Sequence, residues 1–328
     1  MRLLPRSRWR RTLALAGGIT AVAGSAIWGI EREVVRRARR RPDPDAGSDF
    51  ELAYDAHRMI ATRDGGKLAV YSRGSGATIV FSHGATLAAQ VWVKQFADLP
   101  RRGFRVVAYD QRGHGSSDVG DDGHSPRALA ADVRSVLETL DLHDAVLVGH
   151  SMGGLAVGAF AAWHRAVAME RVRGIVMVGA LARTMLGDTG RAVVEQIAEH
   201  APDYGALFTR PDLGFVVTRL GFGRSPQPSH VEFVRRLMVS CSADTRHAVG
   251  PMLLDADLSD ELPTIEIPVL VVGGTADLLT PPAGARHLAG LIPGARLEIL
   301  DGAGHLPMLE RADELDDLIA AFATEVGA

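Results

Sequence analysis

The chain has 328 residues, of which 47% are hydrophobic and 23% are charged, an ordinary globular composition with enough apolar residues for a large core. Its single cysteine, Cys241, excludes an internal disulfide and a thiolate metal cluster within one chain. The sequence also lacks HExxH and paired CxxC spacings, the P-loop and the dinucleotide-binding glycine motif, so we expect no metal and no cofactor.

Charge is distributed unevenly, although the formal net charge is only −3. Residues 1–41 contain eleven arginines and two acidic residues, Glu31 and Glu33, so the remainder of the chain is acidic. A folded domain that binds nucleic acid needs a basic surface to neutralise phosphates. We therefore expect no nucleic-acid partner.

An uncharged, moderately apolar segment covers residues 12–30, with arginines on both sides, and is about as long as a bilayer span requires. We interpret it as a single membrane anchor, through which the protein would be membrane-associated; the side is undetermined because both flanks are basic. Two alternatives stay open. One is export after cleavage of a signal peptide near Ala21-Val22-Ala23, and the other is a peripheral or soluble amphipathic extension.

The segment after Arg41 reads PDPDAGS, which is polar and interrupted by prolines, as is typical of a linker. Residues 1–48 are thus predicted to be a basic N-terminal segment with a linker. The folded part should begin near residue 50.

From there on, short apolar runs alternate with helical periodicities, which predicts an α/β fold with a mostly parallel central sheet flanked by helices. Runs at 57–62 and 68–72 surround Asp64-Gly65-Gly66 and predict an opening hairpin. Runs rich in Val, Ile and Leu predict buried strands at 78–82, 105–109, 145–148, 174–178, 269–272 and 297–300.

Helices are predicted in the intervals between these strands. Ser125 is a good N-cap and Pro126 suits a first helical position, after which Leu129, Val133, Val136, Leu137 and Leu140 recur at helical spacing. A similar apolar stripe predicts a closing helix around Leu315, Leu318, Ile319 and Phe322.

Residues 181–262 interrupt this alternation, since they contain no convincing buried strand and their apolar residues are spread among charges. We expect a helical cap here, between a first core part at 49–180 and a second at 263–328. The cap would be a lid whose apolar underside receives substrate, or its apolar residues would simply pack the insertion together.

The stretch Gly149-His150-Ser151-Met152-Gly153 follows a predicted strand and precedes a helix-like segment of small residues. A GxSxG sequence in this context is typical of a nucleophile elbow, in which a sharp strand-to-helix turn presents the serine hydroxyl. Ser151 is therefore the candidate nucleophile. Taken without the context, the same residues would be a glycine-rich turn.

A serine nucleophile needs a histidine base and an acid that orients the histidine, here in the chain order Ser, acid, His. Asp277 follows the predicted strand 269–272, and His305 follows the strand 297–300 on a glycine-rich loop. Both should reach the sheet edge at which Ser151 lies. Weaker candidates are Asp255 and Asp257 in the insertion, His287 in a predicted helix, and His83, His114 and His150, which precede Ser151.

Two backbone N–H groups are needed to stabilise the tetrahedral oxyanion. The amide of Met152, directly after the nucleophile, is one candidate. The other is the amide of Ala85, because His83-Gly84-Ala85 follows the strand 78–82 and its glycine allows close approach of the backbone. The alternative for this second loop is a turn that merely ends the strand.

Across residues 55–325 the chain resembles the alpha/beta hydrolase superfamily, in its serine esterase and monoacylglycerol lipase-like branch. The matching pieces are His83-Gly84-Ala85, Asp110-Gln111-Arg112-Gly113-His114-Gly115-Ser116-Ser117, Gly149-His150-Ser151-Met152-Gly153-Gly154, Asp277 and His305. The resemblance implies a structural role for the 110–115 loop, with no chemical role for His114, and a helical cap after the sixth strand. Epoxide hydrolases have an aspartate at the elbow and a pair of tyrosines in the insertion. This chain instead has a serine at the elbow, and Tyr204 is the only tyrosine of its insertion.

These features predict a serine hydrolase that cleaves a carboxylic ester of an apolar acyl substrate, such as a lipid, through a Ser151–His305–Asp277 triad and an acyl-enzyme. Perhydrolases and carbon–carbon bond hydrolases use the same triad and stay open as alternatives. So does a non-catalytic binding protein with a hydrolase fold.

Overall fold

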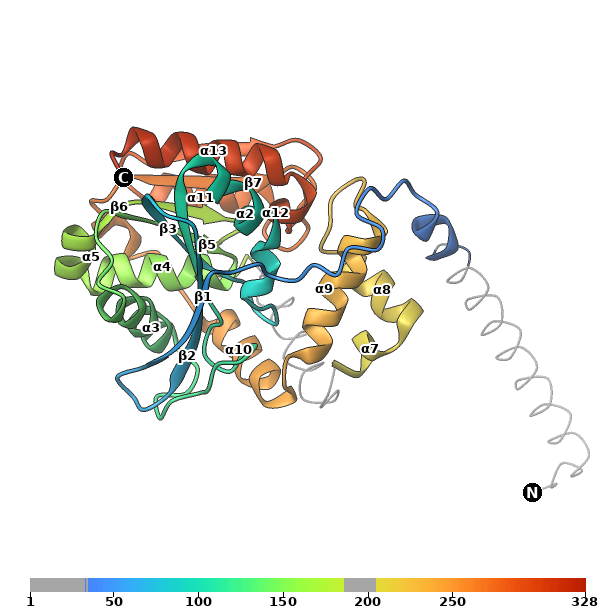
Figure 1. The fold of residues 1–328 in the computed structure, drawn as a ribbon, viewed down its shortest axis with the longest axis horizontal. Coiled ribbons are helices and arrows are strands. Elements are labelled where there is room, and N and C mark those ends of the chain that lie inside the picture. Colours follow the sequence, from blue (N-terminus) through green and yellow to red (C-terminus); the bar gives the residue numbers. More distant parts are fainter. Residues whose placement is uncertain (1–32, 34, 186–204) are drawn as a thin grey trace, which may run out of the picture.

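The computed structural model describes residues 33, 35–185 and 205–328, and its centre is an eight-stranded sheet in the order β1-β2-β4-β3-β5-β6-β7-β8 (Figure 1). The strands are β1 (Ala56–Ala61), β2 (Lys67–Arg73), β3 (Ala77–Ser82), β4 (Phe104–Tyr109), β5 (Ala145–His150), β6 (Val172–Val178), β7 (Val269–Gly274) and β8 (Arg296–Leu300). Each predicted strand is present, with small shifts at its ends. The alpha/beta hydrolase fold expected from the sequence is confirmed.

The sheet is parallel from β4 to β8, and only the hairpin β1–β2 and the β2–β4 pair are antiparallel. β5 is buried at every position, and so is β7. Helices cover both faces of a parallel sheet, which explains why its central strands are continuous apolar runs. The carboxyl ends of these parallel strands share one edge, which brings together residues that follow β3, β5, β7 and β8.

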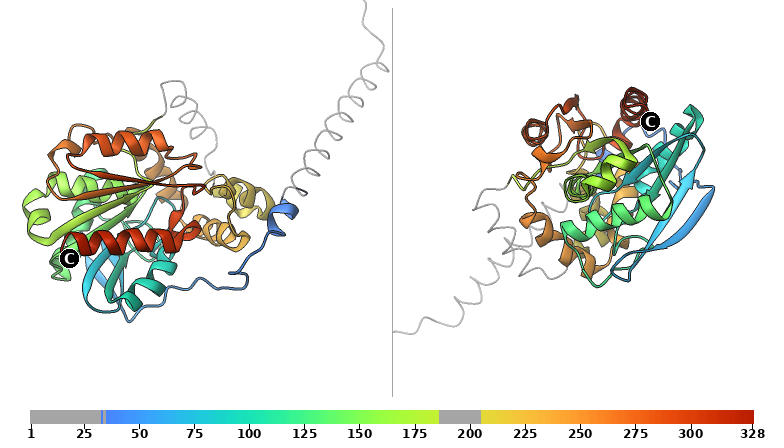
Figure 2. Two further views of the ribbon diagram at one scale, coloured as in Figure 1. Left: turned by 90° about the horizontal axis from the view of Figure 1, so that it is seen from above. Right: turned by 90° about the vertical axis from the view of Figure 1, so that its left-hand side faces the viewer.

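Each face of the sheet has its own layer of helices (Figure 2). One layer contains α3 (Pro126–Thr139), α4 (Met152–Trp163) and α11 (Pro282–Leu291), and the other contains α2 (Val93–Asp98) and α13 (Ala312–Glu325). The Ser125 hydroxyl accepts a hydrogen bond from the Ala128 amide at 3.1 Å, as its predicted N-cap role requires. Shorter elements are η1 (Ala89–Trp92), η2 (Leu99–Arg102), α5 (Arg165–Arg171), η3 (Leu262–Thr264) and α12 (Pro307–Glu310).

The described part of the insertion is helical. It consists of α7 (Gly205–Thr209), α8 (Pro211–Arg219), α9 (Pro228–Ser240) and α10 (Ala243–Asp255), and α7 to α9 gather beside the core (Figure 1). Phe208, Phe215, Phe222 and Phe233 are all buried, so these rings pack the insertion internally and against the core. Tyr204 and the apolar Leu186 lie outside the described residues.

The N-terminal residues 35–50 form an arm that packs along α8 and α9. Val35 and Phe50 are buried, and the Phe50 ring stacks on that of Phe233 at 4.7 Å. The Asp45 carboxylate contacts Lys94 of α2 at 2.6 Å and His230 of α9 at 2.7 Å. The polar residues that suggested a linker therefore have partners in both the core and the insertion.

The sequence predicted a membrane-anchored location through residues 12–30, a segment that lies outside the described residues. Within residues 33, 35–185 and 205–328 no helix has the length and apolar character needed to cross a bilayer. The longest helices of this part, α3 and α13, have 14 residues each, whereas a span takes about 20. This finding overturns the predicted membrane location.

Candidate active site

Ser151 lies on the sharp turn between β5 and α4, where its backbone has φ 53° and ψ −114°. This left-handed conformation is rare for residues other than glycine and costs of the order of 1–3 kcal/mol. The neighbouring glycines permit it: a Cβ at Gly149 would lie 2.3 Å from the Gly153 carbonyl oxygen, and one at Gly153 would lie 2.1 Å from that of Ser82. Ser151 is half-buried, as the predicted elbow requires.

His305 and Asp277 are brought together at the same edge of the sheet. The His305 Nδ1 atom lies 2.9 Å from Asp277 Oδ2, and both side chains are almost fully buried. Burial would raise the pKa of Asp277, but the hydrogen bonds from His305 and Thr280 outweigh it, so the pKa is lowered and the carboxylate is ionised at neutral pH. An ionised acid at Nδ1 holds the ring so that Nε2 is the basic nitrogen.

The loop after β6 connects Ser151 with this pair. The Ser151 amide donates to the Val178 carbonyl at 2.9 Å, and the position of a Cβ on the next residue, Gly179, lies 3.3 Å from His305 Nδ1. The ring of His150 lies 4.7 Å from the ring of His305. The serine and the histidine–aspartate pair therefore border one site, although they lie far apart in the sequence.

The two candidate oxyanion donors are backbone amides at the elbow and on the loop beside it. Met152 is the first residue of α4, so its amide has no intrahelical acceptor. The Ala85 amide has no acceptor within the described part of the chain. Gly84, beside it, lies so close to the elbow that a Cβ there would be 3.3 Å from the Cβ of Ser151.

Two buried histidines support the Ala85 loop. His83 Nε2 accepts the Gln111 amide at 2.9 Å, and His114 Nε2 accepts the Thr86 amide at 3.1 Å. Burial lowers the pKa of His83 to about 4 and that of His114 to about 3, so both rings are neutral near pH 7 and can accept these bonds. Their contacts are those of loop supports.

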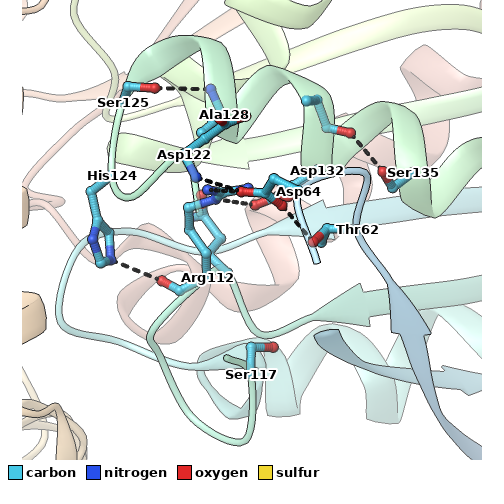
Figure 3. A network of polar contacts seen from close by, with 12 residues as sticks. Thr62, Asp64, Arg112, Ser117, Asp122, His124, Ser125, Ala128, Asp132 and Ser135 are labelled. Carbon is cyan, nitrogen blue, oxygen red and sulfur yellow. Dashed lines mark hydrogen bonds and ion pairs between the residues drawn. The ribbon is translucent and has the colours of Figure 1, made fainter. Parts of the chain in front are cut away.

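The 110–115 loop is held by a buried ion-pair network (Figure 3). The Arg112 guanidinium binds both carboxylate oxygens of Asp132, at 2.7 and 2.8 Å, and also contacts Asp64 at 3.0 Å. Arg112 and Asp132 are each 1% exposed. Because His114 of this loop accepts the Thr86 amide, the network fixes the loop that carries Ala85.

The weaker candidates lie elsewhere or have other contacts. Asp257 pairs with Arg183 in an isolated β-bridge and accepts the Ser259 amide, and His287 is exposed on α11. His150 is buried and donates from Nε2 to the backbone carbonyl of His305 at 2.7 Å. Burial lowers its pKa well below the ordinary value, so it is a neutral support of His305.

Sequence reasoning missed Thr280 and Glu310. The Thr280 hydroxyl lies 2.5 Å from Asp277 Oδ2 and 3.2 Å from His305 Nδ1, and the Thr280 amide donates to Asp277 Oδ1 at 2.8 Å. An aspartate followed three residues later by threonine at the start of a helix is a weak turn signal that could have pointed to this contact. Glu310 binds backbone amides on both sides of His305.

Comparison with known proteins decides the family. The model of the alpha/beta hydrolase family matches residues 79–318, which include the elbow and the two other candidate residues. The chain belongs to the alpha/beta hydrolase family. A superfamily protein of Bacillus subtilis is 30% identical over 80% of this chain and 98% of its own length.

Other relatives of this hydrolase carry more specific names. A non-heme haloperoxidase of Rhodococcus erythropolis is 30% identical over 80% of this chain and 98% of its own length. Among solved structures, a thermophilic esterase from Thermogutta terrifontis superposes with a TM-score of 0.71 and 26% identity, over 83% of this chain and all of the esterase. The chain is thus a member of a family of alpha/beta hydrolase enzymes.

Proposed function

We propose that this hydrolase cleaves a carboxylic ester of an apolar acyl substrate with Ser151 as nucleophile, His305 as general base and Asp277 as orienting acid. The observation that carries the proposal is the Asp277–His305 bond of 2.9 Å beside a serine held in a strained elbow. A serine hydroxyl becomes an effective nucleophile only beside such a base. The similarity to the thermophilic esterase from Thermogutta terrifontis points the same way.

In the proposed reaction, Ser151 Oγ attacks the ester carbonyl while His305 Nε2 takes its proton. The Met152 and Ala85 amides stabilise the oxyanion, a single such donor being worth about 2.7–4 kcal/mol in other serine hydrolases. His305 then returns the proton to the leaving alcohol. Water attacks the acyl-enzyme in the same way and releases the acid. Every catalytic group in this scheme is a side chain or a backbone amide of this chain.

Exposed apolar side chains beside the histidine support an apolar substrate. Leu278 and Leu279, directly after Asp277, are 72% and 59% exposed, and Leu220 of the cap is 55% exposed. A Cβ at Gly221 would lie 3.9 Å from Leu279 and 3.5 Å from Leu306, so these residues border one another next to His305. Apolar side chains at this position next to His305 favour an acyl chain over a polar group.

The test is hydrolysis of a p-nitrophenyl ester series of increasing acyl length by the wild type and by Ser151→Ala. We expect turnover of the wild type and a fall of kcat by at least about 10³-fold in the variant, with an unchanged melting temperature. Ser75→Ala, an exposed serine in the loop between β2 and β3, is the matched control and should keep full activity. Turnover by Ser151→Ala at the wild-type rate would refute the proposal.

A second candidate is perhydrolysis, which the haloperoxidase relative favours. Hydrogen peroxide would replace water in the attack on the acyl-enzyme, and the product would be a peracid. Adding peroxide and acetate and following bromide oxidation by the released peracid tests this activity. Formation of peracid by the wild type but not by Ser151→Ala would support it, and its absence would leave water as the acceptor.

A further inference from the structure

Glu310, at the end of α12, binds three backbone amides around His305. Its Oε1 atom accepts the amides of Gly304 at 3.1 Å and Leu306 at 3.2 Å, which are the two neighbours of His305 in the chain. Its Oε2 atom accepts the amide of Gly223, in the cap, at 2.6 Å. One carboxylate therefore joins the histidine loop to the cap.

The same cap segment contacts the histidine loop through its backbone. The His305 amide donates to the Gly221 carbonyl at 2.8 Å, and the Arg224 amide donates to the Gly302 carbonyl at 3.0 Å. A Cβ at Gly223 would lie 2.1 Å from the Gly302 oxygen. The two backbones thus pack more closely than any side chain would permit.

Arg219, the last residue of α8, holds the carbonyl groups of this cap segment. Its guanidinium donates to the carbonyl oxygen of Phe222 at 3.0 Å and of Arg224 at 3.3 Å. In the segment 221–224, the Arg219 cation therefore binds two carbonyl oxygens and the Glu310 carboxylate binds one amide. Bonds from neutral amides to an ionised group are about twice as strong as neutral ones.

We propose that Glu310 is a positioning residue, which fixes His305 relative to Ser151 by tying the His305 loop to cap residues 221–224. The proposal rests on the proposed function, in which His305 is the general base. Displacing a general base by about 1 Å can lower the rate about 100-fold. A movement of the cap would then change the position of His305 through the Glu310 carboxylate.

The direct test is Glu310→Gln, which keeps the shape but replaces one acceptor oxygen by an amide NH₂ group, a donor that faces a backbone N–H. Glu314→Gln is the matched control, because Glu314 lies four residues on and its side chain is 57% exposed. We expect Glu310→Gln to lower kcat and the rate of Ser151 labelling by a fluorophosphonate about tenfold or more. KM should change less than about threefold and the control should match the wild type.

A second variant reaches the same contact from the cap. Gly223→Ala leaves Glu310 intact but forces the cap segment away from Gly302, so it should lower the labelling rate as Glu310→Gln does. Gly290→Ala is its control, because a Cβ there meets no atom within 4 Å. Should Glu310→Gln fail to fold, Gly223→Ala decides the question.

Hydrogen exchange separates this inference from the proposed function. In Glu310→Gln, amide exchange should rise together in segments 221–224 and 302–306, and not in Glu314→Gln. A rise in neither or in only one segment, or a folded variant that labels at the wild-type rate, would overturn the positioning role. An unlabelled wild type would instead refute the proposed function, while the exchange data would still decide whether Glu310 joins the two segments.

Discussion

Ser151 combines two properties that rarely coincide: a backbone φ of 53° and a position immediately before an apolar helix. Local strain of this size persists only where the surrounding structure enforces it. Here the glycines at 149 and 153 let β3, β5 and α4 close around the turn. The strain thus marks the residue around which the site is built.

The role of Asp277 gives a prediction about rate. Asp277→Asn keeps the shape but removes the charge that orients His305 in the proposed mechanism, so we expect kcat/KM for a p-nitrophenyl ester to fall about 10⁴-fold with little change in KM. Asp301→Asn is the control, since Asp301 follows β8 nearby but its side chain is 78% exposed. Loss of less than tenfold in Asp277→Asn would assign the orienting role to another residue.

Asp316 gives a prediction about pH and stability. Burial raises its pKa to about 7 from an ordinary value of 3.8, and its one described donor is Gln95 at 2.9 Å. The folded state therefore holds this proton over a pH range in which the unfolded chain releases it. The stabilisation is complete below the unfolded pKa and is lost as pH rises through about 7.

Asp316→Asn should remove this pH dependence. Its free energy of unfolding should exceed that of the wild type increasingly between about pH 4 and pH 7 and by a constant amount above that, up to a few kcal/mol, since one pKa unit corresponds to about 1.4 kcal/mol. Denaturant unfolding at several pH values measures the difference. Asp317→Asn, with a 71% exposed side chain, is the control and should show the pH dependence of the wild type. If Asp316→Asn also showed the pH dependence of the wild type, the buried carboxyl would be ionised in the wild type without penalty.

At the scale of elements, the arm of residues 35–50 gives a prediction about stability. Phe50 is 4% exposed and stacks on Phe233 of α9, so Phe50→Ala should lower the free energy of unfolding by about 3 kcal/mol or more. Tyr54→Ala, at a 50% exposed position four residues on, should cost less than about 1 kcal/mol. A loss in Phe50→Ala as small as that expected for Tyr54→Ala would mean that the packing of Phe50 does not stabilise the fold.

The ion-pair network of the 110–115 loop gives another prediction about stability. Arg112→Met leaves Asp132 buried without its cation and should destabilise the protein by about 3–5 kcal/mol. The double variant Arg112→Met with Asp132→Leu should regain much of that loss, because the Asp132 carboxylate, which the single variant buries without its cation, is removed as well. Thermal unfolding measures both, and a double variant as unstable as the single one would contradict the charge-pair explanation.

For the whole molecule, the strand pattern was predictable because parallel strands buried on both faces must be apolar throughout. The candidate residues were predictable because each follows such a strand at one edge of the sheet. Thr280 offered only a weak local turn signal beside Asp277. Glu310 was not predictable, since its partners are backbone amides, one of which belongs to the distant Gly223 of the insertion. The proline-rich stretch before Phe50 looks like a linker for the same reason: the partners of Asp43 and Asp45 are Ser229 and His230, far along the chain.

The division of the chain also belongs to this scale. We propose that residues 49–180 and 263–328 form one hydrolase core and that residues 181–262 form its cap. The arm, the Glu310 carboxylate and the Thr245–Gly113 bond of 2.8 Å each join cap and core at a different point. A cap attached at several points would open by local movement of its helices and not as one free body.

The central claim is that Ser151 is the nucleophile activated by His305. Its most direct test is covalent labelling of the intact protein with a fluorophosphonate, followed by mass spectrometry of the modified peptide. We predict a single adduct on Ser151, which is absent in Ser151→Ala and forms at least about 10³-fold more slowly in His305→Ala. Ester turnover without an adduct on Ser151, or equal labelling of the His305 variant, would contradict the claim.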